Sequence, residues 1–371
     1  MAKEHVLKVA GHPSIYAPAQ PREFTLYFCE PQNGVTSETG LLLLIPGFGA
    51  NAQSKVYKKM RSLFADKYNL VTIQCDYFGW EFMQNSLAGK ISLNLEQLKT
   101  IIPPEQISQV ITSNSIDLQN LLELGSQHNT TIDITCIPPE TPTNFNDMGL
   151  MQALDNLAAI GYVMAILEDN KCTFDTSKII VYGHSQGAYL SYLCNALTPN
   201  LFTLLIDNSA WIFPLYSKAL RTLTMISGQL QVNIYYDYLA RRINDFDQDI
   251  LHLPNLYTQF SNSTQILSYH GIDDELISFK QKQAFCSHIN NCLLIPIGKS
   301  AVDNIKFKST KHGLGADFLE LFEDAIQKFS AGNFPLNRNP IKPTELHYIS
   351  AKHQYQVTYD QGIPILKKFA L

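Results

Sequence analysis

A short serine-containing turn between two apolar segments constrains the fold of this chain more than any other feature. The turn reads Gly183-His184-Ser185-Gln186-Gly187 and matches the pattern G-x-S-x-G. Residues 178–182 are short and largely β-branched, which predicts a buried strand, and residues 188–194 have the apolar spacing of a helix. A serine at such a corner is held in a strained turn that lifts its hydroxyl out of the sheet. The pattern therefore predicts that Ser185 is a nucleophile, with both glycines required because a Cβ would strike the adjoining strand or helix.

A nucleophilic serine needs a base to take its proton and an acid to orient that base. In a sheet with this kind of turn, the acid and then the histidine follow the serine along the chain. An expected strand at 264–269 is followed by Asp274, which places this carboxylate on the same rim of the sheet as the serine. A second expected strand at 292–297 is followed by a polar loop that contains His312. We therefore expect a triad of Ser185, Asp274 and His312.

Each of these assignments has an alternative. Asp273 is adjacent to Asp274, and only one of the two can face the imidazole. Asp207 ends an earlier expected strand and is a third candidate for the acid. His270 ends a strand, and we expect it to be structural, with its imidazole tied to backbone groups. For His312 the alternative to a catalytic role is stabilisation of its loop.

Together these motifs resemble those of the α/β-hydrolase superfamily, and within it the prolyl-oligopeptidase and acyl-esterase branches. The resemblance is carried by residues 174–179 before the serine turn, by His270-Gly271-x-x-Asp274-x-x-Ile277 and by His312-Gly313. The chain is also similar to an uncharacterised bacterial family within the superfamily. The resemblance extends over about residues 41–329. It implies an α/β fold with a mostly parallel central sheet and helices on both faces, and it favours Asp274 as the acid.

The resemblance also implies where the oxyanion would bind. Residues 41–45 form an all-apolar run, as expected for a strand covered on both faces, and Pro46-Gly47-Phe48-Gly49 follows it. In the superfamily one backbone N–H comes from this loop and another from the residue after the nucleophile. By position these donors are Phe48 and Gln186. Pro46 departs from the family, in which many members have histidine there, but this leaves the N–H donors intact. The alternative is that the two glycines only form a turn.

Composition is that of an ordinary soluble enzyme. The length would allow two domains, but the alternation of expected strands and helices over about residues 41–329 favours one catalytic domain with insertions. The chain has 371 residues, of which 45% are hydrophobic and 16% charged. A net charge of -5 and a pI near 6.1 do not indicate binding to nucleic acid. We find no basic amphipathic stretch and no apolar stretch long enough to span a membrane. The N-terminus lacks the apolar core of a signal peptide. Seven cysteines without metal-ligand spacing favour a reducing cytoplasm, and the expected chemistry requires no metal or organic cofactor.

Two insertions and a C-terminal extension lie outside a minimal hydrolase. The insertions, at about 77–146 and 209–262, should both leave the carboxyl end of the sheet, where ligands bind in open α/β folds. We expect them to form a cap whose aromatic side chains line the substrate site. The alternative is that these aromatics only pack the cap onto the body. The extension, about 336–371, contains Pro340 and Pro343 and should end in a β-hairpin.

The sequence therefore predicts a serine hydrolase that acts on an ester through an acyl-enzyme, as a carboxylesterase or deacylase. The expected substrate is a small-molecule or glycan-borne ester. The same triad would serve an amidase, a peptidase or an acyltransferase, and a non-catalytic binding protein on this scaffold is a further alternative.

Overall fold

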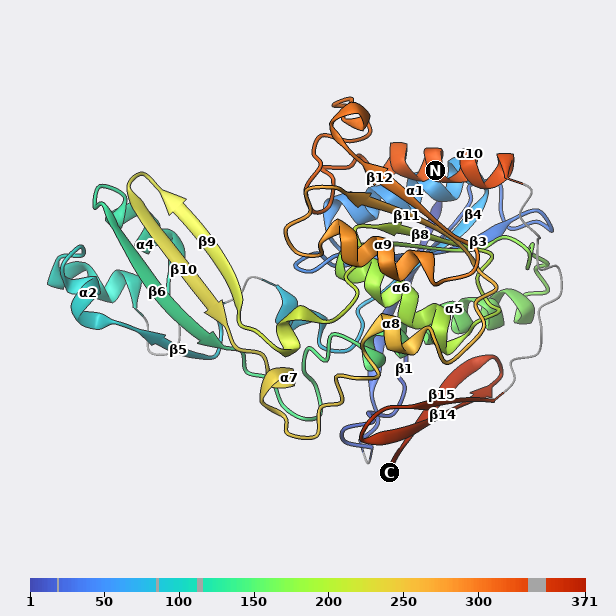
Figure 1. Cartoon of the computed structure of the whole chain (residues 1–371), viewed down its shortest axis with the longest axis horizontal. Helices are drawn as coiled ribbons and strands as arrows, with labels where there is room; N and C mark the ends of the chain where they lie inside the picture. Colours follow the sequence, from blue (N-terminus) through green and yellow to red (C-terminus); the bar gives the residue numbers. More distant parts are fainter. Residues whose placement is uncertain (19, 85–86, 112–115, 333–344) are drawn as a thin grey trace. The chain divides into compact units, whose positions relative to one another are not determined.

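The chain forms two compact units in the computed structural model (Figure 1), which describes residues 1–18, 20–84, 87–111, 116–332 and 345–371. Unit 1 comprises Met1–Phe78, Met148–Pro214 and Asp247–Leu371. Unit 2 comprises Gly79–Asp147 and Leu215–Phe246. The two insertions expected from the sequence therefore contribute to a single separate unit. Their bounds differ from the expected ones, because residues 209–214 and 247–262 belong to unit 1.

Unit 1 contains an eight-stranded sheet in the order β1-β2-β4-β3-β7-β8-β11-β12. Its strands are β1 (Lys3–Ala10), β2 (Glu23–Glu30), β3 (Gly40–Ile45), β4 (Leu70–Cys75), β7 (Ile179–His184), β8 (Leu204–Asn208), β11 (Gln265–Gly271) and β12 (Cys292–Ile297). β1 and β2 pair antiparallel at one edge, and the six strands from β4 to β12 are parallel. This strand order and direction define the α/β-hydrolase fold, as the sequence predicts.

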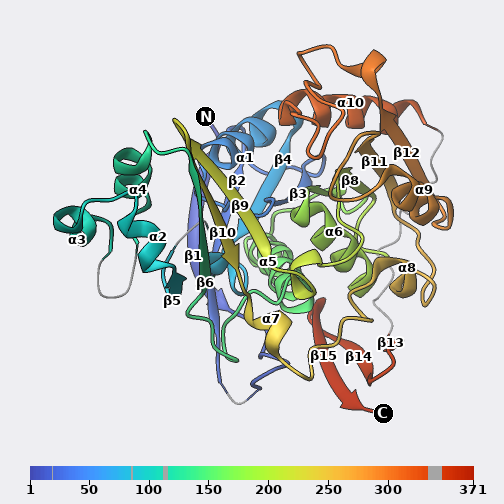
Figure 2. The same ribbon diagram turned by 60° about the vertical axis from the view of Figure 1, so that its left-hand side comes forward.

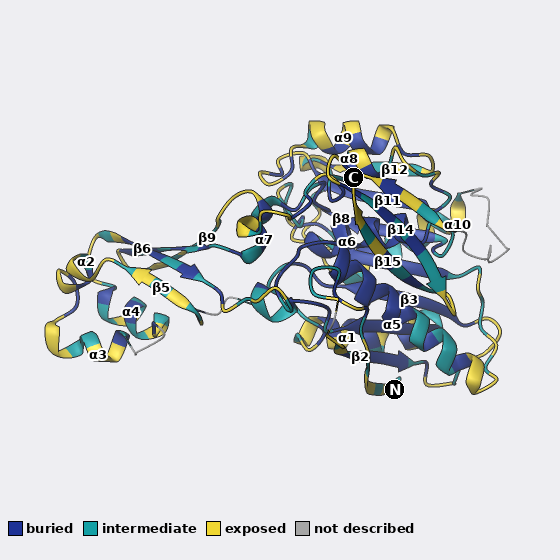
Figure 3. Cartoon of the chain, turned by 90° about the horizontal axis from the view of Figure 1, so that it is seen from below, coloured by how far each residue is buried: buried dark blue, intermediate teal, exposed yellow. Residues whose placement is uncertain are grey.

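Helices cover both faces of the sheet (Figure 1). One face is covered by α1 (Lys55–Tyr68) and α10 (Phe318–Ala331). The other face is covered by α5 (Leu150–Asp169), α6 (Gln186–Leu197) and α9 (Phe279–Ser287). Phe64 of α1 and Phe322 of α10 pack with Leu42 and Leu44 of β3 in one buried cluster. All six residues of β3 are buried (Figure 3), which explains its uninterrupted apolar sequence.

Helix α5 corrects one expectation from the sequence. Its span Leu150–Asp169 is long and apolar enough to cross a membrane, whereas the sequence predicted no stretch of that length. However, 78% of this apolar window is buried inside the protein, as in the core helix of a soluble domain. Asp155 of α5 is fully buried and pairs with Arg22 at 2.7 Å, so polar side chains of this helix are satisfied within unit 1.

The C-terminal extension forms a separate antiparallel sheet of β13 (Leu346–Ile349), β14 (His353–Asp360) and β15 (Ile363–Ala370). Gln361 and Gly362 connect β14 to β15 with φ values of 48° and 85°, the conformation of a two-residue hairpin turn. The predicted hairpin is thus confirmed. β15 lies beside α5 (Figure 2), where Gly161 admits the side chain of Ile363. The part of the extension that holds Pro340 and Pro343 lies outside the described residues.

Unit 2 is built on a four-stranded mixed sheet in the order β5-β6-β10-β9. Its elements are β5 (Lys90–Leu93), α2 (Leu95–Lys99), α3 (Ile107–Val110), α4 (Leu118–Gly125), β6 (Thr130–Ile137), β9 (Arg221–Ser227), β10 (Leu230–Tyr236) and α7 (Leu239–Arg242). β6 from the first insertion and β10 from the second pair in parallel at the centre. Ile132, Ile134, Val232 and Ile234 form the buried face of this pair.

Short elements complete the two units. The 3-10 turns are Trp80–Met83, Pro104–Gln106, Leu215–Ser217 and Lys299–Ala301, and α8 (Leu253–Leu256) packs against α6 in unit 1.

Candidate active site

Ser185 occupies a strained corner between β7 and α6. Its φ and ψ are 55° and -117°, a left-handed conformation that a non-glycine residue rarely adopts. A Cβ on Gly183 would lie 2.4 Å from the backbone of Ala188, and one on Gly187 would lie 2.1 Å from the carbonyl oxygen of Ile45. Both glycines are therefore required by close backbone packing. The sharp turn presents the Ser185 hydroxyl at the carboxyl end of the sheet, with 7% of the residue exposed.

The structure brings the three predicted triad residues together. The Oγ atom of Ser185 lies 2.7 Å from Nε2 of His312, and Nδ1 of His312 lies 2.8 Å from Oδ2 of Asp274. Asp274 follows β11, and His312 lies on the loop between β12 and α10. In a neutral imidazole the carboxylate fixes the proton on Nδ1 and leaves Nε2 as the acceptor for the serine hydroxyl. This is the arrangement needed to take a proton from Ser185.

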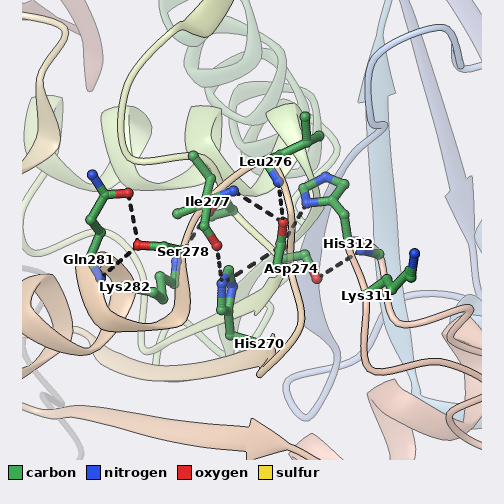
Figure 4. A network of polar contacts seen from close by, with 12 residues as sticks. His270, Asp274, Leu276, Ile277, Ser278, Gln281, Lys282, Lys311 and His312 are labelled. Atoms are coloured by element: carbon green, nitrogen blue, oxygen red, sulfur yellow. Dashed lines mark hydrogen bonds and ion pairs between the residues drawn. The ribbon is translucent and has the colours of Figure 1, made fainter.

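The Asp274 side chain is fully buried and held by backbone donors (Figure 4). Its Oδ1 atom accepts hydrogen bonds from the N–H groups of Leu276 at 2.9 Å and Ile277 at 3.1 Å. Burial alone would raise the pKa of this carboxyl. The hydrogen bond and charge of His312, together with the Ile277 N–H, outweigh burial and hold the pKa below its usual value. Asp274 therefore stays ionised beside the imidazole.

The alternative acids have other partners. Asp273 accepts a hydrogen bond from the Thr310 hydroxyl at 2.6 Å. Asp207 forms a fully buried ion pair with Lys282 at 2.6 Å. Neither contact involves His312, so the geometry selects Asp274 as its partner.

His270 supports the loop that carries Asp274, as the sequence predicts. Its Nε2 atom lies 2.9 Å from the carbonyl oxygen of Ile277 and 3.6 Å from Oδ2 of Asp274 (Figure 4). Burial, and then the charge of Lys282, lowers the pKa of His270. The neutral imidazole therefore donates to the backbone and braces the turn from Asp274 to Ile277.

The loop after β3 lies against the serine turn. A Cβ on Gly47 would lie 2.7 Å from Nδ1 of His184, and Pro46 closely approaches Gly187. The Gly47 N–H donates to the Tyr57 hydroxyl at 3.3 Å, which fixes the loop to α1. Phe48, the predicted oxyanion donor, therefore follows a residue in contact with the serine turn. Gln186, the other predicted donor, is the first residue of α6, where backbone N–H groups lack intrahelical acceptors.

The Phe48 side chain stacks on Trp211 at a ring distance of 6.0 Å. Trp211 is one of the aromatics that we expected in the second insertion, but it lies in unit 1, in the segment after β8. The expectation that aromatics of unit 2 line the substrate site stays a prediction.

Sequence analysis missed the structural role of His184. Its ring packs against Phe318 at 5.1 Å, and a Cβ on Gly313 would lie 3.0 Å from its Nε2 atom. Burial, and then the charge of His312, lowers the pKa of His184 to about 4. A neutral imidazole thus fills the space between the Gly47 loop and the His312 loop. No local sequence signal indicates this role, because the two glycines that face His184, Gly47 and Gly313, are both distant from it along the chain.

A cavity of about 900 Å³ in unit 1 is separate from the triad. It is lined by α5, by residues around the amino ends of β7 and β8, and by the C-terminal sheet. The triad lies at the carboxyl ends of the same strands. Among the described residues, no group of three or more His, Cys, Asp or Glu side chains could hold a metal ion.

The chain was compared with known proteins. Among curated proteins, none matches the sequence. One similar solved structure is Est1E from Butyrivibrio proteoclasticus with bound ferulic acid, with 16% identity, a TM-score of 0.44 and coverage of 83% of this chain and 94% of that one. Another is a thermophilic esterase from Thermogutta terrifontis, with 12% identity, a TM-score of 0.44 and coverage of 90% and 94%. At this level of similarity they say nothing about activity, and the fold assignment rests on the strand order.

The match to a family model is more extensive. Residues 23–229, more than half of the 371 in the chain, match the family described as protein of unknown function DUF2920. The matched segment includes β3, the loop with Phe48, the Ser185 turn and β8. The chain belongs to the DUF2920 family.

Proposed function

We propose that this protein is a serine hydrolase that cleaves a carboxylic ester, as a carboxylesterase or deacylase. The observation that carries the proposal is the continuous hydrogen-bonded series Ser185–His312–Asp274, with distances of 2.7 and 2.8 Å. The series begins at a serine in a strained turn and ends at a buried carboxylate. These are the elements that convert a weakly nucleophilic hydroxyl into a nucleophile at neutral pH.

Each group has a distinct role in the proposed reaction. His312 Nε2 takes the hydroxyl proton as Ser185 Oγ attacks the acyl carbon and the carbonyl π electrons move to oxygen. The N–H groups of Phe48 and Gln186 stabilise the resulting oxyanion. His312 then gives the proton to the departing alkoxide, which leaves an acyl-enzyme and an alcohol. In the second half, His312 takes a proton from water as the water oxygen attacks the acyl carbon. The bond between the acyl carbon and Ser185 Oγ then breaks as His312 returns the proton to Oγ, which releases the carboxylic acid and regenerates Ser185. Asp274 orients the imidazole and stabilises its protonated form throughout.

The backbone strain at Ser185 supports a catalytic protein over a binding protein on the same scaffold. A non-glycine residue with φ 55° costs about 1–3 kcal/mol, and such strain persists where the surrounding structure imposes it for function. Here Gly183 and Gly187 permit the close packing that imposes it. The expected substrate is a small-molecule or glycan-borne ester, and the expected compartment is a reducing cytoplasm.

The test of this proposal is covalent labelling by a fluorophosphonate probe. Wild-type protein should be labelled on the peptide that contains Ser185, and it should hydrolyse a small aryl ester. The Ser185→Ala variant should lose both reactions. Its melting temperature should not fall below that of the wild type, because alanine keeps the backbone conformation at this position and removes only the catalytic hydroxyl. Absence of labelling in folded wild-type protein would refute the nucleophile assignment.

A panel of substrates then separates the activities that share this triad. Matched ester and amide substrates report the leaving group, and an added alcohol or amine reports transfer of the acyl group. We expect ester cleavage with water as the acceptor. Faster cleavage of the amide, or product formed mainly on the added acceptor, would overturn the esterase assignment and leave the nucleophile assignment intact.

A further inference from the structure

The corner that follows β8 contacts both the nucleophile and the base of the proposed site. The carbonyl oxygen of Asn208 accepts the N–H of Ser185 at 2.8 Å. The next residue, Ser209, is fully buried, and its hydroxyl oxygen accepts the N–H of Gly313 at 3.1 Å. Gly313 directly follows His312. Two consecutive residues of one strand end therefore hold the backbone of the Ser185 turn and the backbone of the His312 loop.

Ser209 has an unusual backbone conformation for a serine. Its φ is 60°, in the left-handed region where glycine is the unstrained choice. Glycine would lack the hydroxyl that reaches Gly313. The hydroxyl also donates to the Asn208 side-chain oxygen at 3.2 Å, which orients its lone pairs toward the Gly313 N–H. A side chain retained at a strained position indicates that the side chain itself is used.

A buried charge network imposes this conformation. Oδ1 of Asp207 accepts the N–H of Ala210 at 2.6 Å, so the carboxylate spans the corner that contains Ser209. Its Oδ2 accepts from the Lys282 ammonium at 2.6 Å and from the hydroxyls of Ser268 and Tyr192 at 2.7 and 2.9 Å. These donors belong to α9, β11 and α6. The corner is thus fixed to three surrounding elements.

The other side of the His312 loop is attached to the segment after β11. The N–H of Asp273 donates to the carbonyl oxygen of Thr310 at 3.0 Å, and the Thr310 hydroxyl donates back to the Asp273 carboxylate. These contacts precede His312 in the chain, whereas the contact with Ser209 follows it. The base is therefore held on both sides, by the β11 segment and by the β8 corner.

We propose that Ser209 is a positioning residue for the general base, whose hydroxyl holds Gly313 and thereby keeps the His312 imidazole in line with Ser185. This inference rests on the proposed function of the same site. Removal of the hydroxyl leaves the Gly313 N–H without this acceptor and lets the loop move relative to the serine turn. The proton transfer then slows, while substrate binding is unaffected.

Two substitutions and one control test the inference. Ser209→Ala removes the hydroxyl and keeps the backbone strain, and Ser209→Gly removes both. The matched control is Thr72→Val in β4, which removes a fully buried hydroxyl that donates to the Arg61 carbonyl and lies on β4, away from the His312 loop. Both Ser209 variants should lower kcat for an aryl ester by about 10-fold at unchanged KM, as expected for one lost buried hydrogen bond. The control should keep wild-type kcat.

Two further measurements separate positioning from a loss of stability. Amide hydrogen exchange at Gly313 should be faster in both Ser209 variants than in wild type and unchanged in Thr72→Val. Ser209→Gly should melt at a higher temperature than Ser209→Ala and yet have the same low kcat. Wild-type kcat in both variants, or a kcat that follows melting temperature across all three, would overturn the inference.

Failure of the proposed function has a different signature. In that case wild-type protein shows neither labelling nor turnover. The exchange rate of the Gly313 amide still reports on the Ser209 contact, and exchange unaffected by Ser209→Ala would exclude even the structural contact.

Discussion

Two buried carboxylates at the same rim of the sheet differ in what they can do. Asp207 is the penultimate residue of β8, and Asp274 follows β11, the neighbouring strand. Both accept several hydrogen bonds, but the partner of Asp207 is the fully buried Lys282 and the partner of Asp274 is the partly exposed His312. A lysine ammonium in that place only neutralises charge, whereas an imidazole can exchange a proton with Ser185. The difference teaches that the partner, and not the strand position or burial, assigns a carboxylate its role.

The largest expected effect is the loss of activity in Asp274→Asn. An asparagine keeps the shape but cannot stabilise the protonated imidazole, and the equivalent exchange in serine proteases lowers kcat about 10⁴-fold. Steady-state kinetics on an aryl ester would measure this. Asp273→Asn is the matched control: its carboxylate contacts Thr310 and not His312, and the asparagine side-chain oxygen can still accept the Thr310 hydroxyl, so this variant should keep most of the activity. Equal losses in the two variants would contradict the assignment of the acid.

The second effect is on stability, in Asp207→Asn. This substitution leaves the Lys282 ammonium buried without its counter-charge, which costs about 3–5 kcal/mol of unfolding free energy. Urea denaturation would measure the loss. The double variant Asp207→Asn with Lys282→Met should recover part of it because no unpaired charge remains. An Asp207→Asn protein with wild-type stability and a 10⁴-fold lower kcat would reverse the roles of the two carboxylates.

The third effect is a pH dependence of stability with two separate windows. The pKa of His184 is lowered from 6.5 to about 4 in the folded protein, so between these values the unfolded chain binds a proton that the folded protein does not. Stability should fall as pH decreases through this window, by less than about 1.4 kcal/mol per pH unit. The pKa of Asp274 is lowered, so its contribution is present above its usual pKa of 3.8 and is lost as pH falls further.

Denaturation at a series of pH values would resolve the two windows. His184→Gln should reduce the slope of stability against pH in the upper window, to which His270 and His12 also contribute because burial lowers the pKa of both, and it should leave the lower window unchanged. Asp274→Asn should reduce the slope in the lower window and leave the upper one unchanged. A His184→Gln curve that parallels wild type from pH 6.5 to 4 would show that this imidazole is not the group that titrates.

The smallest expected effect concerns the loop after β3, which contains neither carboxylate. Tyr57→Phe removes the hydroxyl that accepts the Gly47 N–H, a neutral contact worth about 1 kcal/mol. The kcat should fall a few-fold at unchanged KM, because Phe48 follows the loosened residue. Tyr68→Phe, in the same helix but bonded to Glu323, is the control and should leave kcat unchanged. Identical kinetics of both variants would show that Tyr57 does not set the geometry of this loop.

The parts that could be predicted from the sequence are those encoded locally. The turn at Ser185 is predicted by a β-branched run before it, glycines on either side of the serine and an apolar helical pattern after it. Asp274 and His312 each follow a recognisable strand. The antiparallel C-terminal hairpin was also predictable, because Gln361-Gly362 lies between two strand-like segments. In all these cases neighbouring residues carry the signal.

The remaining features depend on residues that are distant along the chain. The contact of Ser209 with Gly313 and the pairing of Asp207 with Lys282 span 104 and 75 positions, and nothing near either residue indicates its partner. The bounds of unit 2 differ from those of the expected insertions for a related reason. The strands β6 and β10 pair across about 100 residues, as in Asn233 with Asp133, so composition alone could not show which part of each insertion they occupy.

The central pairing of β6 with β10 has a consequence for biosynthesis. Residues 148–214 separate the two segments of unit 2 and contain β7, the Ser185 turn and β8. During synthesis, β6 emerges from the ribosome first, and it cannot pair with β10 until residue 236 has been made. By then β3, β4, β7 and β8 are already available to pair with one another. The order of synthesis therefore favours assembly of the nucleophile turn before the interrupted unit closes its own sheet.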